Sequence, residues 1–244
     1  MSDLTHLDRF ILELRDAPDI EGAFGCLGRA VERIGFQYHT YELLRPPSGI
    51  GPSLYTTTYP KDWIARYIEK GYGRDDTVCQ ILPTKLLPFL WTDATRSPRL
   101  SARQAAIVNE SRDAGIWAGA SIPVHGPGNA RAYVAVADRT SDDEFARRFA
   151  RYRYELQLIA IYTHEKVIDV AVPAAGATPT RLTPRETEIM AWTARGKTAW
   201  EISEILAVSH QTVKDHIERV CRKLDVNNKT HATALALLRG YIAL

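Results

Sequence analysis

Apolar side chains recur every three or four residues along much of this 244-residue chain, the spacing that places them on one face of an α-helix. Near the amino terminus, Leu7, Phe10 and Leu14 share such a face. A longer stripe runs from Phe145 to Val167. In the first 170 residues this period predicts helices over residues 4–20, 20–34, 60–69, 101–114 and 142–169.

Shorter stretches between these helices are rich in Val, Thr and Tyr, a composition typical of β-strands. Two of them flank the turn Gly126-Pro127-Gly128 and predict a hairpin. Helices around antiparallel strands predict an α+β fold, an α-β-α sandwich on an antiparallel sheet. We expect strands over residues 36–44, 54–59, 118–125 and 130–137, with a loop and a short extended piece over 81–91 that includes Trp91.

Residues 171–181 differ in composition from the chain on either side. Ala, Pro and Gly dominate there, and no charge occurs before Arg181. Such a segment is typical of a linker between domains. We therefore divide the chain into a first domain of residues 1–170, a linker of residues 171–181 and a second domain of residues 182–244. The length of the 142–169 helix leaves one face for its own sheet and another for a sister chain, so we expect a homodimer.

Capping residues divide the second domain into four short helices. Pro184 suits the first position of a helix that Gly196 ends. Thr198 and Glu201 stand three residues apart and can form a capping box. The residues expected to begin the four helices are Thr183, Thr198, Ser209 and Thr230, and the fourth helix is expected to bury Ala234, Leu237 and Leu238.

The third of these helices has one apolar and one polar face. Its apolar stripe is expected to be buried, and a tight corner at Ala207-Val208 separates it from the second helix. This arrangement predicts an all-α, four-helix helix-turn-helix domain whose third helix enters the DNA major groove. A helical bundle whose polar face only meets water is the alternative that each single feature leaves open. The buried stripe is Val213, Ile217, Val220 and Leu224.

The residue types on the polar face suggest which side chains contact bases and which contact phosphates. Lys can address guanine and Glu can address cytosine, whereas hydroxyl groups and Arg often contact phosphates. We expect Gln211, Lys214 and Glu218 near base edges, and Thr198, Ser209, Thr212 and Arg222 near phosphates.

Charge and chemistry exclude other classes of protein. Residues 181–244 carry 10 Lys and Arg against 7 Asp and Glu, a modest excess that suits phosphate contact. The three cysteines, Cys26, Cys79 and Cys221, are too far apart in sequence for a zinc cluster or a disulfide scaffold. No phosphate-binding loop, nucleophile elbow or metalloprotease motif occurs, so we expect neither catalytic nor metal-binding residues. With no leader or apolar span, a cytoplasmic protein without membrane contact is expected.

The second domain also resembles a known family. The run LTPRE from Leu182, followed by ARGKT, EIS, TVK and KL, is similar to the DNA-binding domain of the LuxR/FixJ class of bacterial regulators. The family's key positions fall on Glu186, Met190, where Leu is commoner, and Gly196. Members of this class carry either a ligand-binding or a receiver domain in front. A receiver domain should alternate parallel strands with helices, and this chain does not.

The first domain resembles the acyl-homoserine-lactone-binding domain of LuxR-type quorum-sensing regulators. The pattern W-x3-Y-x8-D-x-V and a G-x-S-I-P run beginning at Gly119 carry this likeness, although Thr77 replaces the usual Pro. The resemblance implies that Trp63 donates to the lactone carbonyl, Tyr67 bonds the acyl carbonyl and Asp76 accepts from the amide. It also implies that Trp91 packs on the lactone ring and that Tyr59 and Ser121 touch the ligand.

These features together predict a quorum-sensing transcription factor that needs no cofactor. It would bind an N-acyl-homoserine lactone and regulate palindromic promoter DNA as a dimer, with RNA polymerase as a further partner. A short branched or aryl acyl group is the expected tail, since Tyr41, Tyr55 and Tyr59 would suit a compact one. The alternatives are a helix-turn-helix regulator that senses another small molecule and a regulator gated by phosphorylation.

Overall fold

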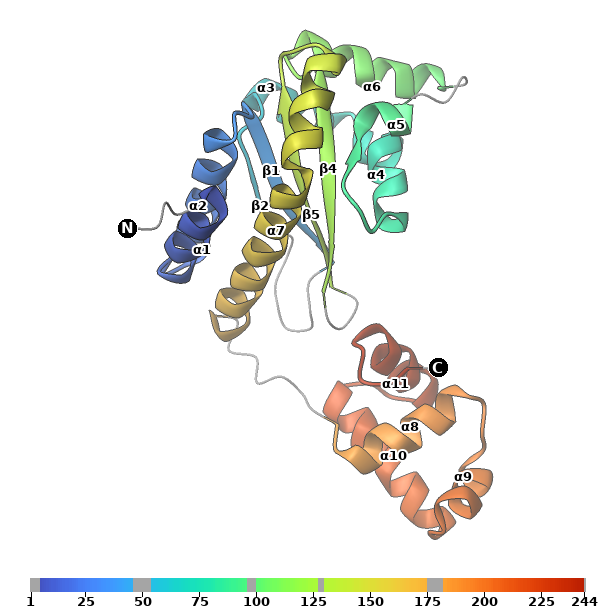
Figure 1. Cartoon of the computed structure of the whole chain (residues 1–244). Helices are drawn as coiled ribbons and strands as arrows, with labels where there is room; N and C mark the ends of the chain where they lie inside the picture. The colour runs from blue at the N-terminus through green and yellow to red at the C-terminus, as the bar shows by residue number, and fades with distance from the viewer. Residues whose placement is uncertain (1–4, 46–53, 96–99, 127–129, 175–181, 244) are drawn as a thin grey trace. The chain divides into compact units, whose positions relative to one another are not determined.

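The computed structural model describes residues 5–45, 54–95, 100–126, 130–174 and 182–243 (Figure 1). They form two compact units, one built mainly from residues before Ala171 and the other mainly from residues after it. Pro127 and Gly128 of the predicted turn and most of the predicted linker lie outside the described residues. Among the described helices, none has both the length and the apolar character needed to span a bilayer.

The first unit is an antiparallel sheet between two layers of helices, which confirms the predicted sandwich (Figure 1). The strand order is β2-β1-β5-β4-β3, and all pairs are antiparallel. The strands are β1 (Tyr38–Arg45), β2 (Tyr55–Thr57), β3 (Phe89–Leu90), β4 (Ala118–His125) and β5 (Arg131–Asp138).

Helices cover both faces of this sheet. One layer comprises α1 (His6–Arg15), α2 (Ile20–Arg33) and α7 (Asp142–Ala174). The other comprises α3 (Lys61–Glu69), α4 (Thr77–Ile81), α5 (Trp91–Thr95) and α6 (Ala102–Asp113), with short 3-10 turns at Tyr72–Arg74 and Leu82–Thr84. We call these the α7 layer and the α3 layer.

Two helix ends differ from the sequence-based expectation. The first helix ends at Arg15, not near residue 20, because Pro18 cannot continue it and Asp19 caps α2 instead. The long helix continues to Ala174, so the first residues of the predicted linker are helical. The predicted stripe of α7 is its inward face: Phe145, Phe149, Leu156, Ile159, Thr163 and Val167 are buried, and Tyr152, also predicted, is partly buried.

The expectation that Trp91 lies in an extended piece is wrong. Trp91 is the first residue of α5, directly after the two-residue strand β3. The helices α4 and α5 span five residues each. Such short elements give no periodic signal, and tertiary packing decides their conformation.

Tyr41 faces the α7 layer, so it cannot border a ligand on the opposite face of the sheet. Its hydroxyl lies 3.0 Å from Nδ1 of His164 on α7, and its ring packs on Phe24 of α2. Side chains alternate along a strand, so the adjacent residues Thr40 and Glu42 face the α3 layer. The prediction that Tyr41 borders the acyl tail is therefore wrong.

Two buried histidines, one on β1 and one on α7, predict that acidification lowers the free energy of unfolding. His39 and His164 are each 5% exposed, and burial lowers the pKa of both imidazoles. Below about pH 6.5 these two histidines therefore bind more protons in the unfolded chain than in the folded chain. The stabilisation is complete above that pH and is lost as the pH falls below it. Urea unfolding at several pH values between about 5.5 and 7.5 measures this slope.

His164→Asn is the matched variant for that measurement. The asparagine amide can still accept from the Tyr41 hydroxyl, but it does not titrate. We expect a shallower pH slope, by up to about 1.4 kcal/mol per pH unit, whatever the variant's absolute stability. A slope identical to that of the unaltered protein would contradict the assignment.

The second unit is the predicted four-helix domain, with α8 (Pro184–Ala194), α9 (Ala199–Leu206), α10 (His210–Leu224) and α11 (Lys229–Leu238). Thr183 and Thr198 form capping boxes with Glu186 and Glu201, and Ser209 caps α10. Gly196 has φ +82°, as its helix-ending position requires. The predicted stripe of α10 is confirmed: Val213, Val220 and Leu224 are buried, and Ile217 is partly buried against the same cores.

The start of the fourth helix differs from the expectation. Asn228, not Thr230, caps α11 by accepting from the backbone N–H of His231. Ala232 and Ala236 are consequently the buried residues, whereas Ala234 is exposed and Leu238 is 49% exposed. Leu237 is partly buried, as predicted.

Candidate functional site

The face of the sheet toward the α3 layer presents three rows of side chains that follow from the strand register. The first row is Gly119, Ala137 and Tyr38. The second is Phe89, Ser121, Ala135, Thr40 and Thr57. The third is Pro123, Tyr133, Glu42 and Tyr55. Because strands rise about 3.3 Å per residue, the first and third rows lie roughly 13 Å apart along the strands.

Aromatic rings of α3 and the following turn cover this face. Trp63 is 6% exposed, and its ring meets that of Tyr67 at 5.6 Å between centroids, nearly edge to face. Tyr72 lies against both rings. Trp63 and Tyr67 stand four residues apart on α3, so both side chains point the same way.

Asp76 joins this wall through hydrogen bonds to its own turn. Its Oδ1 accepts from the backbone N–H of Val78 at 2.8 Å, which caps α4, and its Oδ2 accepts from the hydroxyl of Tyr67 at 2.9 Å. Burial raises the pKa of the Asp76 carboxyl, although both hydrogen bonds oppose the shift. The result is a carboxylate held at the site with its two oxygens already oriented.

Trp91 lies flat against the strand β4. Its indole N–H donates to Oγ of Ser121 at 2.9 Å. A Cβ at position 119 would come within 2.5 Å of the indole ring, so only glycine leaves room for it. Gly119 is thus explained by the close approach of Trp91, and the Ser121 O–H remains available to donate elsewhere.

Tyr59 carries a polar group without a partner. Its hydroxyl is buried and makes no hydrogen bond among the described residues. The hydroxyl of Thr40 lies near enough to act against the effect of burial on the Tyr59 pKa, but the hydrogen bond that it makes is with Thr57, at 2.7 Å. Burial raises the pKa of the Tyr59 hydroxyl well above its usual range, so it stays protonated. An unpaired buried donor of this kind is costly unless something else bonds it.

The structure thus brings the predicted ligand-binding residues together. Tyr59, Trp63, Tyr67 and Trp91 all border one core cluster, Asp76 bonds Tyr67, and Ser121 bonds Trp91. Residues that the sequence did not single out complete the surroundings, and only the strand register places the sheet residues there. These are Tyr38, Glu42, Tyr72, Cys79, Ile107, Ile116 and Tyr133.

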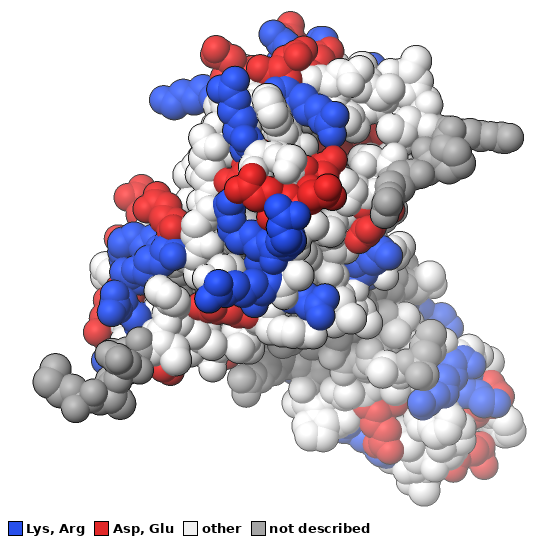
Figure 2. Space-filling model, turned by 45° about the horizontal axis from the view of Figure 1, so that its top comes forward, with Lys and Arg blue, Asp and Glu red and all other residues white. Residues whose placement is uncertain are grey.

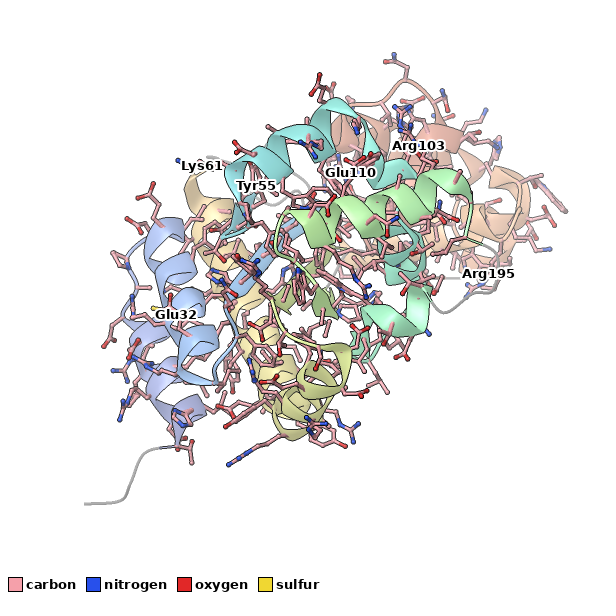
Figure 3. The ribbon with its side chains drawn as sticks, turned by 90° about the horizontal axis from the view of Figure 1, so that it is seen from above. Glu32, Tyr55, Lys61, Arg103, Glu110 and Arg195 are labelled. Atoms are coloured by element: carbon pink, nitrogen blue, oxygen red, sulfur yellow. The ribbon has the colours of Figure 1, made fainter. Side chains whose placement is uncertain are left out.

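Polar contacts on the outside hold the segment that follows α3 against α6. Glu110 of α6 accepts from Lys70 at 2.9 Å and from the hydroxyl of Tyr72 at 2.9 Å. Arg103, also on α6, pairs with Asp75; Figure 3 labels Arg103 and Glu110 on this helix. Figure 2 shows that acidic and basic side chains interleave on the visible face of this unit. Such exposed pairs contribute modestly to stability, but they tie down the segment directly after the helix that carries Trp63 and Tyr67.

The candidate nucleic-acid interface is the polar face of α10. Gln211, Lys214, Glu218 and Arg222 are all exposed there. The side-chain amide of Gln211 donates to Asp215 at 2.8 Å, so this amide must reorient before it can read a base. Thr198 and Ser209 are the N-caps of α9 and α10, and helix N-termini favour phosphate. Thr212 is partly buried, and its hydroxyl lies 2.8 Å from that of Ser209.

Beneath this face, a buried carboxylate ties α8 to α10. Glu186 is 2% exposed, accepts from the backbone N–H of Thr183 at 2.7 Å and pairs with Lys223 at 2.6 Å. These contacts lower the pKa of Glu186 against the opposing effect of burial. They explain why a charged residue occupies a core position. No cluster of three metal-ligating side chains occurs within the described ranges.

Comparison with known proteins gives matches to both units. The model of the autoinducer binding domain matches residues 19–167, and that of the luxR family of bacterial regulatory proteins matches residues 180–236. The chain is 33% identical to the quorum-sensing regulator RhlR of Pseudomonas aeruginosa over 94% of its own length and 93% of the relative's. It is 36% identical to the quorum sensing-dependent regulator RpaR of Rhodopseudomonas palustris over 76% and 74% of the two chains.

Solved structures share the fold. Escherichia coli SdiA superposes with a TM-score of 0.74 at 20% identity and covers 98% of both chains. CepR2 of Burkholderia cenocepacia, described as an N-acylhomoserine lactone dependent transcription factor, superposes with a TM-score of 0.57 at 20% identity. That likeness covers 67% of this chain and 95% of CepR2.

Proposed function

The chain belongs to the LuxR family of quorum-sensing transcription regulators, and from this premise we propose that it binds an N-acyl-homoserine lactone and acts as a dimer on palindromic promoter DNA. The family consists of regulators and not of enzymes. The first unit is the autoinducer-binding domain and the second is the helix-turn-helix domain. We assign dimerisation to the first unit as well, and place the protein in the cytoplasm with its DNA and RNA polymerase.

The observation that carries the lactone proposal is the buried, unpartnered hydroxyl of Tyr59 beside Trp63 and Asp76. An acyl-homoserine lactone presents one amide N–H and two carbonyl oxygens. The site offers the matching set: a carboxylate acceptor in Asp76 and two donors, the Trp63 indole and the Tyr59 hydroxyl. Filling the site would therefore satisfy a donor that the chain alone leaves unpaired.

The roles within this site shift from those that the resemblance implied. Tyr67 already donates its one hydroxyl hydrogen to Asp76, so we propose that it orients that carboxylate. The acyl carbonyl is then bonded by Tyr59, together with the free O–H of Ser121. Trp63 would still donate to the lactone carbonyl, and Trp91 would still pack on the lactone ring. For the tail, a short branched or aryl group remains our proposal.

For DNA, we propose that Gln211, Lys214 and Glu218 approach base edges. Thr198, Ser209, Thr212 and Arg222 would contact phosphates. The exposure of the α10 face and the burial of its opposite stripe support this assignment. Two copies of α10, one DNA turn apart, would match a palindrome.

An exposed apolar stripe on α7 supports the dimer. Tyr154 is 71% exposed, and Leu158 and Ile161 are each more than 40% exposed, at spacings of four and three on one face. Leu158→Glu should therefore shift the ligand-loaded protein to a monomer and weaken its DNA binding. Light scattering and a binding titration measure the two effects. Leu12→Glu on α1, where the leucine is 41% exposed, is the matched control and should leave the dimer intact.

The proposed ligand is tested by mass spectrometry of what co-purifies. Cells that produce the full chain receive either a mixture of acyl-homoserine lactones or none, and the purified protein is extracted. We expect one lactone to be retained at close to one molecule per chain. Retention of an unrelated small molecule from both cultures would favour the alternative that this family member senses a different signal. The antiparallel sheet, unlike the parallel sheet of a receiver domain, argues against gating by phosphorylation.

A further inference from the structure

We propose that the acyl group of the ligand carries a hydroxyl, and that Glu42 and Tyr133 form the subsite that binds it. This inference rests on the proposed lactone function and adds to it the chemistry of the tail. It starts from a carboxylate on the ligand-facing side of the sheet that the recognition of the lactone head does not use.

Glu42 and Tyr133 are paired across the third row of the sheet. They face each other in the register of β1 and β5, and the Tyr133 hydroxyl donates to Oε2 of Glu42 at 2.8 Å. Tyr55, labelled in Figure 3, stands opposite Glu42 on β2 and marks the edge of the row. This row lies roughly 13 Å along the strands from Gly119, where Trp91 packs.

The pair borders the same site as the residues for the lactone head. Tyr133 is a neighbour of Cys79 and Tyr59, and Cys79 in turn lies 3.4 Å from the Tyr67 hydroxyl. Burial raises the pKa of the Cys79 thiol to about 12, so this neighbour is an uncharged thiol. Direct contacts thus link Asp76, Tyr67 and Cys79, and the Tyr133–Glu42 pair lies in the neighbourhood of Cys79.

The hydrogen bonds of the pair leave one acceptor open. Tyr133 uses its single hydrogen on Oε2, and Oε1 of Glu42 has no hydrogen-bond partner among the described residues. An alkyl tail packed against this oxygen would displace water from a carboxylate without replacing its hydrogen bonds, which is unfavourable. A tail hydroxyl would donate to Oε1 in a short, charge-assisted hydrogen bond. A carbonyl oxygen on the tail could not bind there, because it cannot donate a hydrogen bond to Oε1.

A hydroxyl can occur on an aliphatic or an aromatic acyl group, so the experiment has two arms. Each arm compares two lactones that differ by one oxygen: an acyl lactone hydroxylated at the far end of its chain with its deoxy form, and a hydroxyphenyl-acyl lactone with its phenyl form. Reporter cells that produce the full chain give the half-maximal concentration for each compound. Immunoblots of soluble protein check that every variant folds.

The unaltered protein should prefer the hydroxyl compound of one pair by at least about tenfold, the effect of one hydrogen bond to a charged group. Glu42→Gln should bring that ratio close to one while the deoxy compound changes less than about threefold. Tyr133→Phe, which removes the partner but keeps the carboxylate, should retain most of the preference. Glu32→Gln removes the same charge from α2 and should change neither ratio (Figure 3).

Two results would overturn the inference and leave the lactone function standing. One is that plain lactones act but neither hydroxyl compound is preferred. The other is that Glu42→Gln weakens hydroxyl and deoxy compounds equally, as a purely structural pair would. If Glu42→Gln is not soluble, Glu42→Asp replaces it, and an unchanged ratio in both pairs counts against the subsite. If no lactone acts at all, the proposed function fails and the inference fails with it.

Discussion

Replacing Asp76 with asparagine is expected to raise the lactone concentration for half-maximal response by about 100-fold. The carboxylate would accept from the ligand amide in a charge-assisted hydrogen bond, while its oxygens also hold Val78 and Tyr67. An asparagine has one acceptor oxygen and two N–H donors, so it cannot accept from all three groups, and its amide N–H would face a donor. A loss of about 3 kcal/mol corresponds to this factor.

Dose–response curves with the reporter measure that loss, and Asp75→Asn is the matched control. Asp75 is the preceding residue, but its carboxylate points outward and pairs with Arg103 on α6. We expect its removal to change the response less than threefold, because exposed ion pairs contribute little. Equal effects of the two substitutions would mean that Asp76 acts only through the stability of its turn.

The second large effect is expected on the DNA side. Lys214→Ala should weaken binding to the preferred DNA site by about 1–3 kcal/mol, or roughly 5- to 150-fold, if the ammonium reads a base. The side chain is exposed on α10 and lies on the face opposite Val213 and Val220. Its truncation removes no core packing, so the fold of the second unit should survive.

The measurement first selects DNA from a random pool with the unaltered, ligand-loaded protein, then titrates that DNA with the variant. A base-reading lysine should relax specificity at one position of each half-site, whereas a phosphate contact would weaken all sequences alike and lower the salt dependence. Lys61→Ala on α3 removes the same charge from the first unit and serves as control. Unchanged affinity of the Lys214 variant would remove this residue from the interface.

Local signals explain why the second unit could be predicted in such detail. A capping box needs only a hydroxyl and a carboxylate three residues apart, as at Thr183 and Thr198, so it is readable without tertiary contacts. The start of α11, which was predicted wrongly, depends on tertiary contacts. Asn228 and Thr230 are both good caps, and the choice of Asn228 depends on which alanines of α11 pack against the buried core.

The first unit was predictable in its architecture and less so in its site. The stripe of α7 and the strand pair β4–β5 followed from periodicity and turn chemistry. The orientation of Tyr41 did not, because a one-residue change of phase in a strand moves a side chain to the other face. The short helix that begins at Trp91 left no periodic trace either.

By itself, then, the sequence determined where the longer helices form, three of the four caps in the second unit, and which family pattern the chain carries. The helices and their caps depend on residues that are close together along the chain. Only the tertiary structure decided how three polar groups are bonded. The Tyr67 hydroxyl donates to Asp76, and the Tyr59 hydroxyl has no hydrogen-bond partner among the described residues. Tyr133 donates to Glu42. The last pair is 91 residues apart in sequence, and strand register, not local propensity, brings such groups within hydrogen-bonding distance.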